Sequence, residues 1–172
     1  MNVPKWLTDL GIPENCVSHQ SSSEEHGRRF SIRPRRGDTI WHIQVDGCWL
    51  RSIESKKVDS LFWGQSASGR KVVLLVELKG SDFGQALGQI NSTLARLCKR
   101  ADGHGIHIGS HLGSPGHTSL ARGGVCAYVV LSKGRGVPLR LKEREQLRKR
   151  YGVLVHTGER QIEIDGIDAV FG

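Results

Sequence analysis

The chain has 172 residues and a formal net charge of +8, from 25 Lys and Arg against 17 Asp and Glu. This length suffices for one domain with a substantial core, and the basic excess favours a polyanionic partner, most simply nucleic acid. The sequence has no apolar run near the roughly 18 residues of a membrane span and no signal-peptide pattern, so we expect a cytoplasmic protein without a membrane partner.

Four cysteines are scattered along the chain, at Cys16, Cys48, Cys98 and Cys126, and no CxxC pair occurs. Clustered cysteines are typical of disulfide frameworks and zinc sites. The wide spacing therefore predicts reduced, buried thiols.

The N-terminal residues are expected to form short elements. Residues 3–12 have Pro4 near their start and Gly11 near their end, which predicts a short helix. Residues 18–27 are polar, and we expect a loop or a short helix there.

From Arg28 onward the hydrophobic pattern has a period of two, which is typical of half-buried strands. Residues 29–33 and 39–45 alternate in this way. Asp46-Gly47 is a strong hairpin signal, and residues 48–53 would be the returning strand. We therefore predict an antiparallel meander of four or five strands that continues to Lys79.

Basic side chains crowd this region, and two interpretations of them stay open. They could be the solvated charges of an edge strand, which block unwanted strand pairing. They could instead contact the phosphates of a nucleic acid. The candidate nucleic-acid-binding residues here are Arg33, Arg35, Arg36, Lys56 and Lys57.

The most informative stretch is an apolar run, residues 71–79, that lies between Gly69 and Gly80 and ends in Glu77-Leu78-Lys79. Its β-branched and aliphatic residues predict a buried strand. Side chains two apart on a strand share a face, so Glu77 and Lys79 point the same way. A carboxylate at the end of so apolar a strand requires a partner or a metal ion, because an isolated buried charge is costly.

Asp59 supplies a second carboxylate if the strand before this run forms a hairpin with it. Two adjacent carboxylates repel each other, and a divalent cation relieves the repulsion; hard oxygen ligands suit Mg²⁺ or Mn²⁺. The alternative is an ordinary sheet with a salt bridge between Asp59 and Lys79 and a solvated Glu77.

The pattern Asp59…Glu77-x-Lys79, at the end of an apolar strand and followed by a helix, resembles the PD-(D/E)xK nuclease superfamily. Val58 stands where the family name has proline. The resemblance covers residues 50–132 and implies an α/β fold with a mixed central sheet flanked by helices: a restriction-endonuclease-like core, here with antiparallel N-terminal strands. It also implies that Asp59, Glu77 and the Leu78 carbonyl bind Mg²⁺ or Mn²⁺, and that Lys79 is catalytic.

Residues 81–100 predict the clearest helix, with Ser81 or Asp82 as its cap. The resemblance implies that a glutamine of this helix reaches the active site or the substrate. Gln89 matches best as a catalytic residue and Gln85 second, as a nucleic-acid contact; both could equally be surface residues. The family also adds a glutamate from its first helix in many members, and Glu24 or Glu25 are candidates by position.

Residues 102–124 are rich in glycine and histidine, and we expect a loop that closes on substrate. A weaker alternative is a zinc site, although the spacing fits no standard zinc pattern. Its ligands would come from His104, His107, His111 and His117.

The C-terminal third predicts a buried strand at 125–132, a basic helix at 139–151, and a hairpin in which residues 160–164 pair with 153–155. We expect one domain over residues 1–172, with the basic helix and the hairpin following the core. The basic helix could be a solvated face.

These features together predict a metal-dependent nuclease that hydrolyses phosphodiester bonds, and they favour a DNA endonuclease over an enzyme that acts on RNA. The resemblance implies a homodimer or higher homo-oligomer, because small nucleases of this kind often cut both strands as dimers. The alternative is a non-catalytic nucleic-acid-binding protein on the same fold, and Mg²⁺ dependence distinguishes the two.

Overall fold

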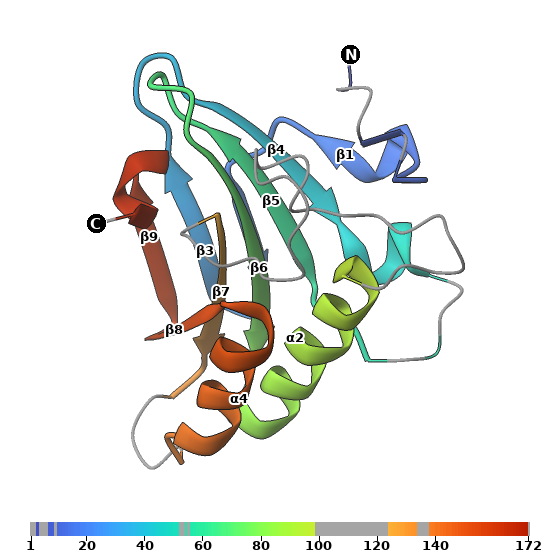
Figure 1. Ribbon diagram of the computed structural model, residues 1–172, viewed down its shortest axis with the longest axis vertical. Helices are drawn as coiled ribbons and strands as arrows, with labels where there is room; N and C mark the ends of the chain where they lie inside the picture. The colour runs from blue at the N-terminus through green and yellow to red at the C-terminus, as the bar shows by residue number, and fades with distance from the viewer. Residues whose placement is uncertain are drawn as a thin grey trace.

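The computed structural model describes residues 3, 7–8, 10–51, 54, 56–98, 124–133 and 138–171, which include two β-sheets (Figure 1). The larger sheet has six strands, in the order β1 (Val17–Ser18), β4 (Thr39–Gln44), β5 (Ser60–Gln65), β6 (Lys71–Lys79), β7 (Val125–Leu131) and β8 (Leu154–Glu159). The smaller sheet has three, in the order β2 (Ser22–Glu25), β3 (Arg28–Arg33) and β9 (Gln161–Asp165).

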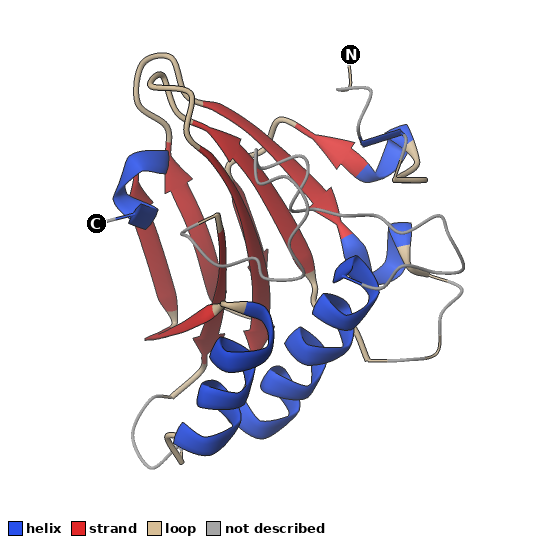
Figure 2. Ribbon diagram, in the orientation of Figure 1, coloured by secondary structure: helices blue, strands red, loops and turns tan. Residues whose placement is uncertain are grey.

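The two long helices, α2 (Phe83–Cys98) and α4 (Leu141–Tyr151), lie side by side over one face of the larger sheet (Figures 1 and 2). Successive side chains of β6 point to opposite faces of the larger sheet, as the period of two requires. Val73 and Leu75 pack toward the helices, whereas Leu74 and Val76 pack toward the smaller sheet. The larger sheet is therefore covered on both faces, which explains why the run 71–79 is continuously apolar.

The larger sheet is mixed. Strands β4, β5 and β6 are antiparallel neighbours, and β6, β7 and β8 are parallel neighbours. Helix α2 makes the crossover from β6 to β7 (Figure 1). The predicted α/β class with a mixed sheet flanked by helices is confirmed, as are the strand at 71–79, the helix after it and the strand at 125–132. In the part of the chain that is described, no helix is long and apolar enough to cross a membrane.

The returning strand predicted at residues 48–53 is wrong for residues 48–51, the part of this range that the structure describes. Residues Val45–Trp49 form a short helical turn, η2, and β4 pairs with β5 instead. Gly47 has φ of 74° and its N–H donates to the Asp46 carboxylate, so the Asp-Gly pair does make a turn. The amides of Val45 and Asp46 donate to the carbonyl of Asp59, which carries the chain beside β5 and not back along β4.

The predicted meander is right only for β4, β5 and β6, because β3 lies in the smaller sheet, antiparallel to β2 and parallel to β9. Residues 18–27, expected to be a loop or a helix, contain β2. His26 and Gly27 both have positive φ, at 48° and 73°, which is the backbone of a tight two-residue hairpin turn. Sequence alternation identifies strands, but it does not say which strands pair.

The predicted C-terminal hairpin is also wrong. Strand β8 joins the larger sheet beside β7, and β9 joins the smaller sheet beside β3. The chain changes sheets at Arg160, which has φ of 60°. The two strands exist at nearly the predicted places, and the basic helix α4 between β7 and β8 is confirmed.

The expectation of reduced cysteines is wrong for Cys16 and Cys48, which form a disulfide with their Cα atoms 5.6 Å apart. It is right for Cys126, which is free and buried. The side chain of Cys98 lies outside the described part. The expected cytoplasmic location therefore loses the support that the cysteines gave it.

Candidate active site

The β5–β6 hairpin brings Asp59 and Glu77 together. Ser60 pairs with Val76, so the residue before β5 lies beside the residue after Val76. The Asp59 amide donates to Glu77 Oε2 over 3.2 Å, and the Leu78 amide donates to Asp59 Oδ2 over 2.6 Å. Each carboxylate is thus fixed by a backbone N–H of the opposite strand. This juxtaposition is the one predicted from the sequence.

Both carboxylates are held in an environment that disfavours their charged forms. The Glu77 side chain is buried, with 1% of its residue surface exposed, and Asp59 is half-buried. Burial and the nearby Asp59 raise the pKa of Glu77 to about 8. Burial also raises the pKa of Asp59 to about 6, although the hydrogen bond from Leu78 opposes this shift. Without a counter-charge, Glu77 is therefore largely protonated at neutral pH.

Lys79 is the cation of this cluster. It lies two residues after Glu77 on the same face of β6 and is half-buried. Its charge lowers the pKa of Glu77 and of Asp59, so it acts on both carboxylates. Glu77 is not solvated, which excludes the alternative of a simple Asp59–Lys79 pair beside a solvent-exposed glutamate.

Helix α2 holds the segment that carries Asp59. Its apolar stripe, which includes Phe83, Ile90 and Leu94, packs on the sheet and turns Gln89 and Thr93 toward residues 57–58. Gln89 Nε2 donates to the Lys57 carbonyl over 2.8 Å.

Thr93, which has no exposed surface, accepts from the Val58 amide over 3.0 Å and donates to the Gln89 carbonyl over 2.9 Å. Gln89 also forms a hydrogen bond that lowers the pKa of Glu77. Two residues one helical turn apart therefore fix the backbone immediately before Asp59.

An open pocket of about 410 Å³ lies beside this pair and has an acidic wall. Glu24 and Glu25 face it from β2, Asp46 faces it from η2, and Asp59 faces it from the start of β5. The charge of Glu25 contributes to the raised pKa of Asp59. The two glutamates thus lie near the site, on a strand and not on the helix that the resemblance implies.

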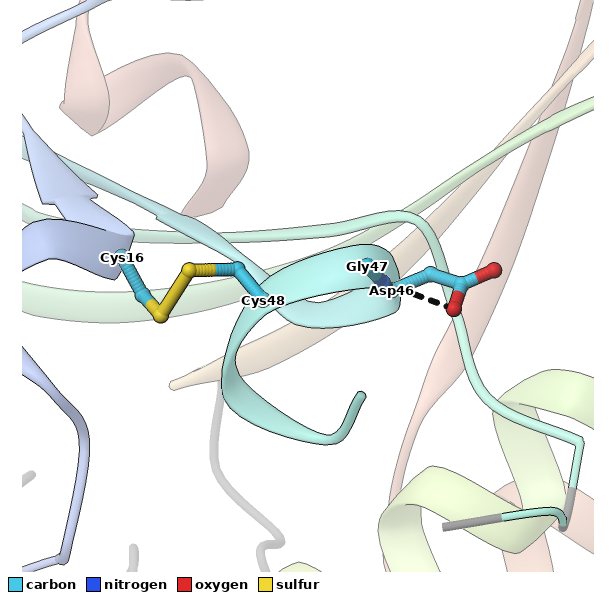
Figure 3. The surroundings of a disulfide bond; sticks show 4 residues. All are labelled: Cys16, Asp46, Gly47 and Cys48. Carbon is cyan, nitrogen blue, oxygen red and sulfur yellow. Dashed lines mark hydrogen bonds between the residues drawn. A yellow bond between two sulfur atoms is a disulfide. The ribbon is translucent and has the colours of Figure 1, made fainter. Parts of the chain in front are cut away.

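Turn η2 is held by a disulfide on one side and lines the acidic pocket on the other (Figure 3). Cys48 forms the disulfide with Cys16, while Asp46 extends from the opposite end of the turn. Asp46 Oδ1 lies 3.3 Å from Lys57 Nζ, and the amides of Val45 and Asp46 hold the Asp59 carbonyl. The disulfide therefore restrains a segment that supports Asp59.

Sequence reasoning missed a polar group beside the acidic pair. His42 Nε2 lies 2.9 Å from Ser60 Oγ, and Ser60 Oγ lies 3.2 Å from Ser23 Oγ. Burial lowers the pKa of His42, so the ring is neutral at neutral pH. The feature of the sequence that could have revealed this group is the position of His42 on the polar side of β4. Thr93 was missed too, although it stands four residues after Gln89.

Several predicted nucleic-acid contacts lie away from this cluster. Arg33 and Arg35 are on or just after β3, and they form ion pairs with Glu163 and Asp165 of β9. Arg36 and Lys56 are exposed, and none of these four lines the acidic pocket.

Two other predicted nucleic-acid contacts, Lys57 and Gln85, lie nearer the site. Lys57 forms an ion pair with Asp46, and its carbonyl accepts a hydrogen bond from Gln89. Gln85 is half-buried on the Gln89 side of α2. The four histidines of the zinc alternative lie outside the described residues.

The ion predicted for this cluster is Mg²⁺ or Mn²⁺. Within the described ranges, no three His, Cys, Asp or Glu residues converge as metal ligands. Mg²⁺, however, is commonly bound by one or two carboxylates and several waters, and two adjacent carboxylates whose pKa values are both raised by burial supply such a pair. Gln89 Oε1 is buried and has no hydrogen-bond partner among the described residues, so a metal-bound water could donate to it. The residues fit the ion.

No protein-family model matches the chain, and comparisons with curated proteins and with solved structures found no match either.

Proposed function

We propose that this protein is a metal-dependent nuclease that hydrolyses phosphodiester bonds, most simply a DNA endonuclease. The observation that carries the proposal is the cluster of Asp59, Glu77 and Lys79 at the end of the β5–β6 hairpin. An antiparallel meander, a crossover helix and a parallel strand surround that cluster. This order supports the restriction-endonuclease-like core that the sequence resemblance implies.

Asp59 and Glu77, with the Leu78 carbonyl, would hold Mg²⁺ or Mn²⁺. The bound ion supplies a polarised phosphate oxygen and a water of lowered pKa. Glu77 would hold the ion as a carboxylate, because the positive charge would reverse the effect of burial on its pKa. Lys79 stabilises the negative charge that develops on the phosphate or orients the attacking water. Gln89 and Thr93 position the segment that bears Asp59.

A non-catalytic nucleic-acid-binding protein is the second candidate. The burial and raised pKa of Glu77 favour it, because a protonated Glu77 is stable in the fold without any metal. The intact set of Asp59, Glu77 and Lys79 favours the nuclease. We also propose a homodimer or higher homo-oligomer, on the resemblance alone.

A cleavage assay separates the two candidates. Native protein and the Asp59→Asn variant are incubated with plasmid, linear duplex, single-stranded DNA and RNA, each with Mg²⁺, Mn²⁺ or EDTA. The nuclease proposal expects metal-dependent cutting by the native protein that the variant loses, and the substrate that is cut identifies the class. Binding in EDTA without cutting under any condition would favour the binding protein.

A further inference from the structure

Helix α4 carries much of the chain's positive charge. Residues 140–151 contain six basic and two acidic side chains, a net charge of +4, which is half of the chain's +8. The basic residues are Arg140, Lys142, Arg144, Arg148, Lys149 and Arg150. Nothing in the site described above uses this charge.

A groove of about 650 Å³ separates α4 from α2. Its α2 wall consists of Gly84, Leu87, Gly88 and Asn91. Its α4 wall consists of Glu143, Gln146, Leu147, Lys149 and Arg150. A Cβ added at Gly88 would meet nothing within 4 Å, so the groove is open there. The groove thus combines open space at Gly88, which allows close approach, with two cations on the facing wall. The Glu143 carboxylate on that wall is paired with Arg140.

The cations of this groove are available to an anion. Lys149 has 76% of its side chain exposed, and its Nζ lies 3.8 Å from Glu145 Oε1. The other oxygen of that carboxylate, Oε2, lies 3.9 Å from Arg148 Nε. Exposed pairs of this kind contribute little to stability, so a phosphate can replace the carboxylate. Arg33 and Arg35 differ, because each has a carboxylate of its own on β9.

The groove and Gln89, which contacts the site, lie on different flanks of α2. Successive helical residues are about 100° apart, so Gly84 and Gly88 lie about 100° around the helix from Gln85 and Gln89. The distance between the two flanks is therefore less than one helix diameter of about 10 Å. A nucleic-acid strand spans that distance with roughly three phosphates, at about 3.4 Å of axis for each.

We propose that the groove between α2 and α4 binds the sugar–phosphate backbone of the nucleic acid whose phosphodiester is held at Asp59 and Glu77. Lys149 and Arg150 contact phosphates, and the open surface at Gly88 admits the backbone. The inference rests on nucleic acid being the partner, as proposed above. It does not require that the site cut.

The test is binding in EDTA, where a metal-dependent nuclease does not cut. Fluorescent single-stranded and duplex DNA are titrated with native protein, with Lys149→Ala/Arg150→Ala, and with Arg51→Ala/Arg70→Ala. The second double variant removes the same charge from exposed residues elsewhere. Circular dichroism checks that each variant is folded.

We expect the α4 variant to bind about tenfold more weakly than native protein at 0.1 M salt, and the slope of log affinity against log salt to fall by about 2. Equal weakening in both double variants would show that net charge alone sets affinity, and would overturn the inference. An unchanged affinity in the α4 variant, or no binding by the native protein, would overturn it too.

A second variant, Gly88→Gln, fills the groove without changing charge. It should fold, because a side chain there meets open space, and it should weaken binding at least threefold. Unweakened binding would contradict the proposed path of the backbone. Failure of the nuclease proposal is separable from these results, because it appears as absent cutting in Mg²⁺ while binding in EDTA persists.

Discussion

Asp59 and Glu77 are held side by side by two hydrogen bonds across the β5–β6 hairpin, each from a backbone N–H of one strand to the carboxylate of the other. The backbone N–H of Asp59 bonds to Glu77, and the N–H of Leu78 bonds to Asp59. The two carboxylates therefore stay adjacent whether or not a counter-ion is present, and burial acts against the charge of both. Such an arrangement is destabilising when both groups are charged and no cation is bound, and it is favourable around a cation.

Replacing Glu77 with glutamine should remove a pH-dependent loss of stability from the metal-free protein. Because the pKa of Glu77 is raised to about 8 and that of Asp59 to about 6, the folded chain keeps protons that the unfolded chain has released. The free energy of unfolding should therefore fall between about pH 4 and pH 8. Glu77→Gln, which still accepts from the Asp59 amide, should be more stable than native protein at pH 8 by at least about 1 kcal/mol.

Urea unfolding in EDTA at several pH values measures this difference. The two proteins should be nearly alike at pH 4, where Glu77 is mostly protonated in both the folded and the unfolded chain. If the free energies of unfolding of the native protein and the variant changed equally with pH, the raised pKa of Glu77 would be contradicted.

Lys79→Met should reduce cleavage by about 10² to 10³ while the protein still binds Mn²⁺, because a fixed charge at the developing phosphate anion is lost. Removing the cation also raises the pKa of both carboxyls, so the pH–rate profile of the remaining activity should move to higher pH. Lys71→Met, at the far end of the same strand, is the matched control. Equal rates for the two variants would exclude a catalytic role for Lys79.

The acidic pair could be predicted because its determinants are local. The apolar run 71–79 shows a buried strand, the period of two places Glu77 and Lys79 on one face, and a hairpin puts Asp59 opposite. The pairing of β3 with β9 could not be predicted, since Arg29 and Gln161 are neighbours only after the rest of the chain has folded. Turn η2 was missed because its partner, the Asp59 carbonyl, is also distant in sequence.

Thr93→Val should destabilise the fold by about 1–3 kcal/mol, because the buried Val58 amide loses its acceptor while the side-chain shape is kept. Cleavage should fall as well, since the segment before Asp59 is less firmly held. Ser92→Ala, on the same helix and half-buried, is the control. Chemical unfolding and the cleavage rate are measured together. Unchanged values for both would show that α2 does not position Asp59.

Cys48→Ser should cost about 3–4 kcal/mol of stability in the oxidised protein, because the disulfide closes a loop with a sequence separation of 32. The loss should also loosen η2, and with it Asp46 and the hydrogen bonds to the Asp59 carbonyl. Unfolding of the native protein with and without reductant, compared with Cys126→Ala, measures the effect. A reductant that changes neither stability nor activity would contradict a supporting role for this bond.

The most direct test of the central claim is the single-turnover rate of nucleic-acid cleavage as a function of Mg²⁺ concentration, for native protein, Glu77→Gln and Glu25→Gln. Glu25 lies on the wall of the same pocket but is not part of the proposed pair. Metal-dependent cleavage that falls by at least about 10³ in Glu77→Gln and by less than about tenfold in Glu25→Gln is the predicted result. Cleavage by native protein in EDTA, or equal rates for native protein and Glu77→Gln, would contradict it.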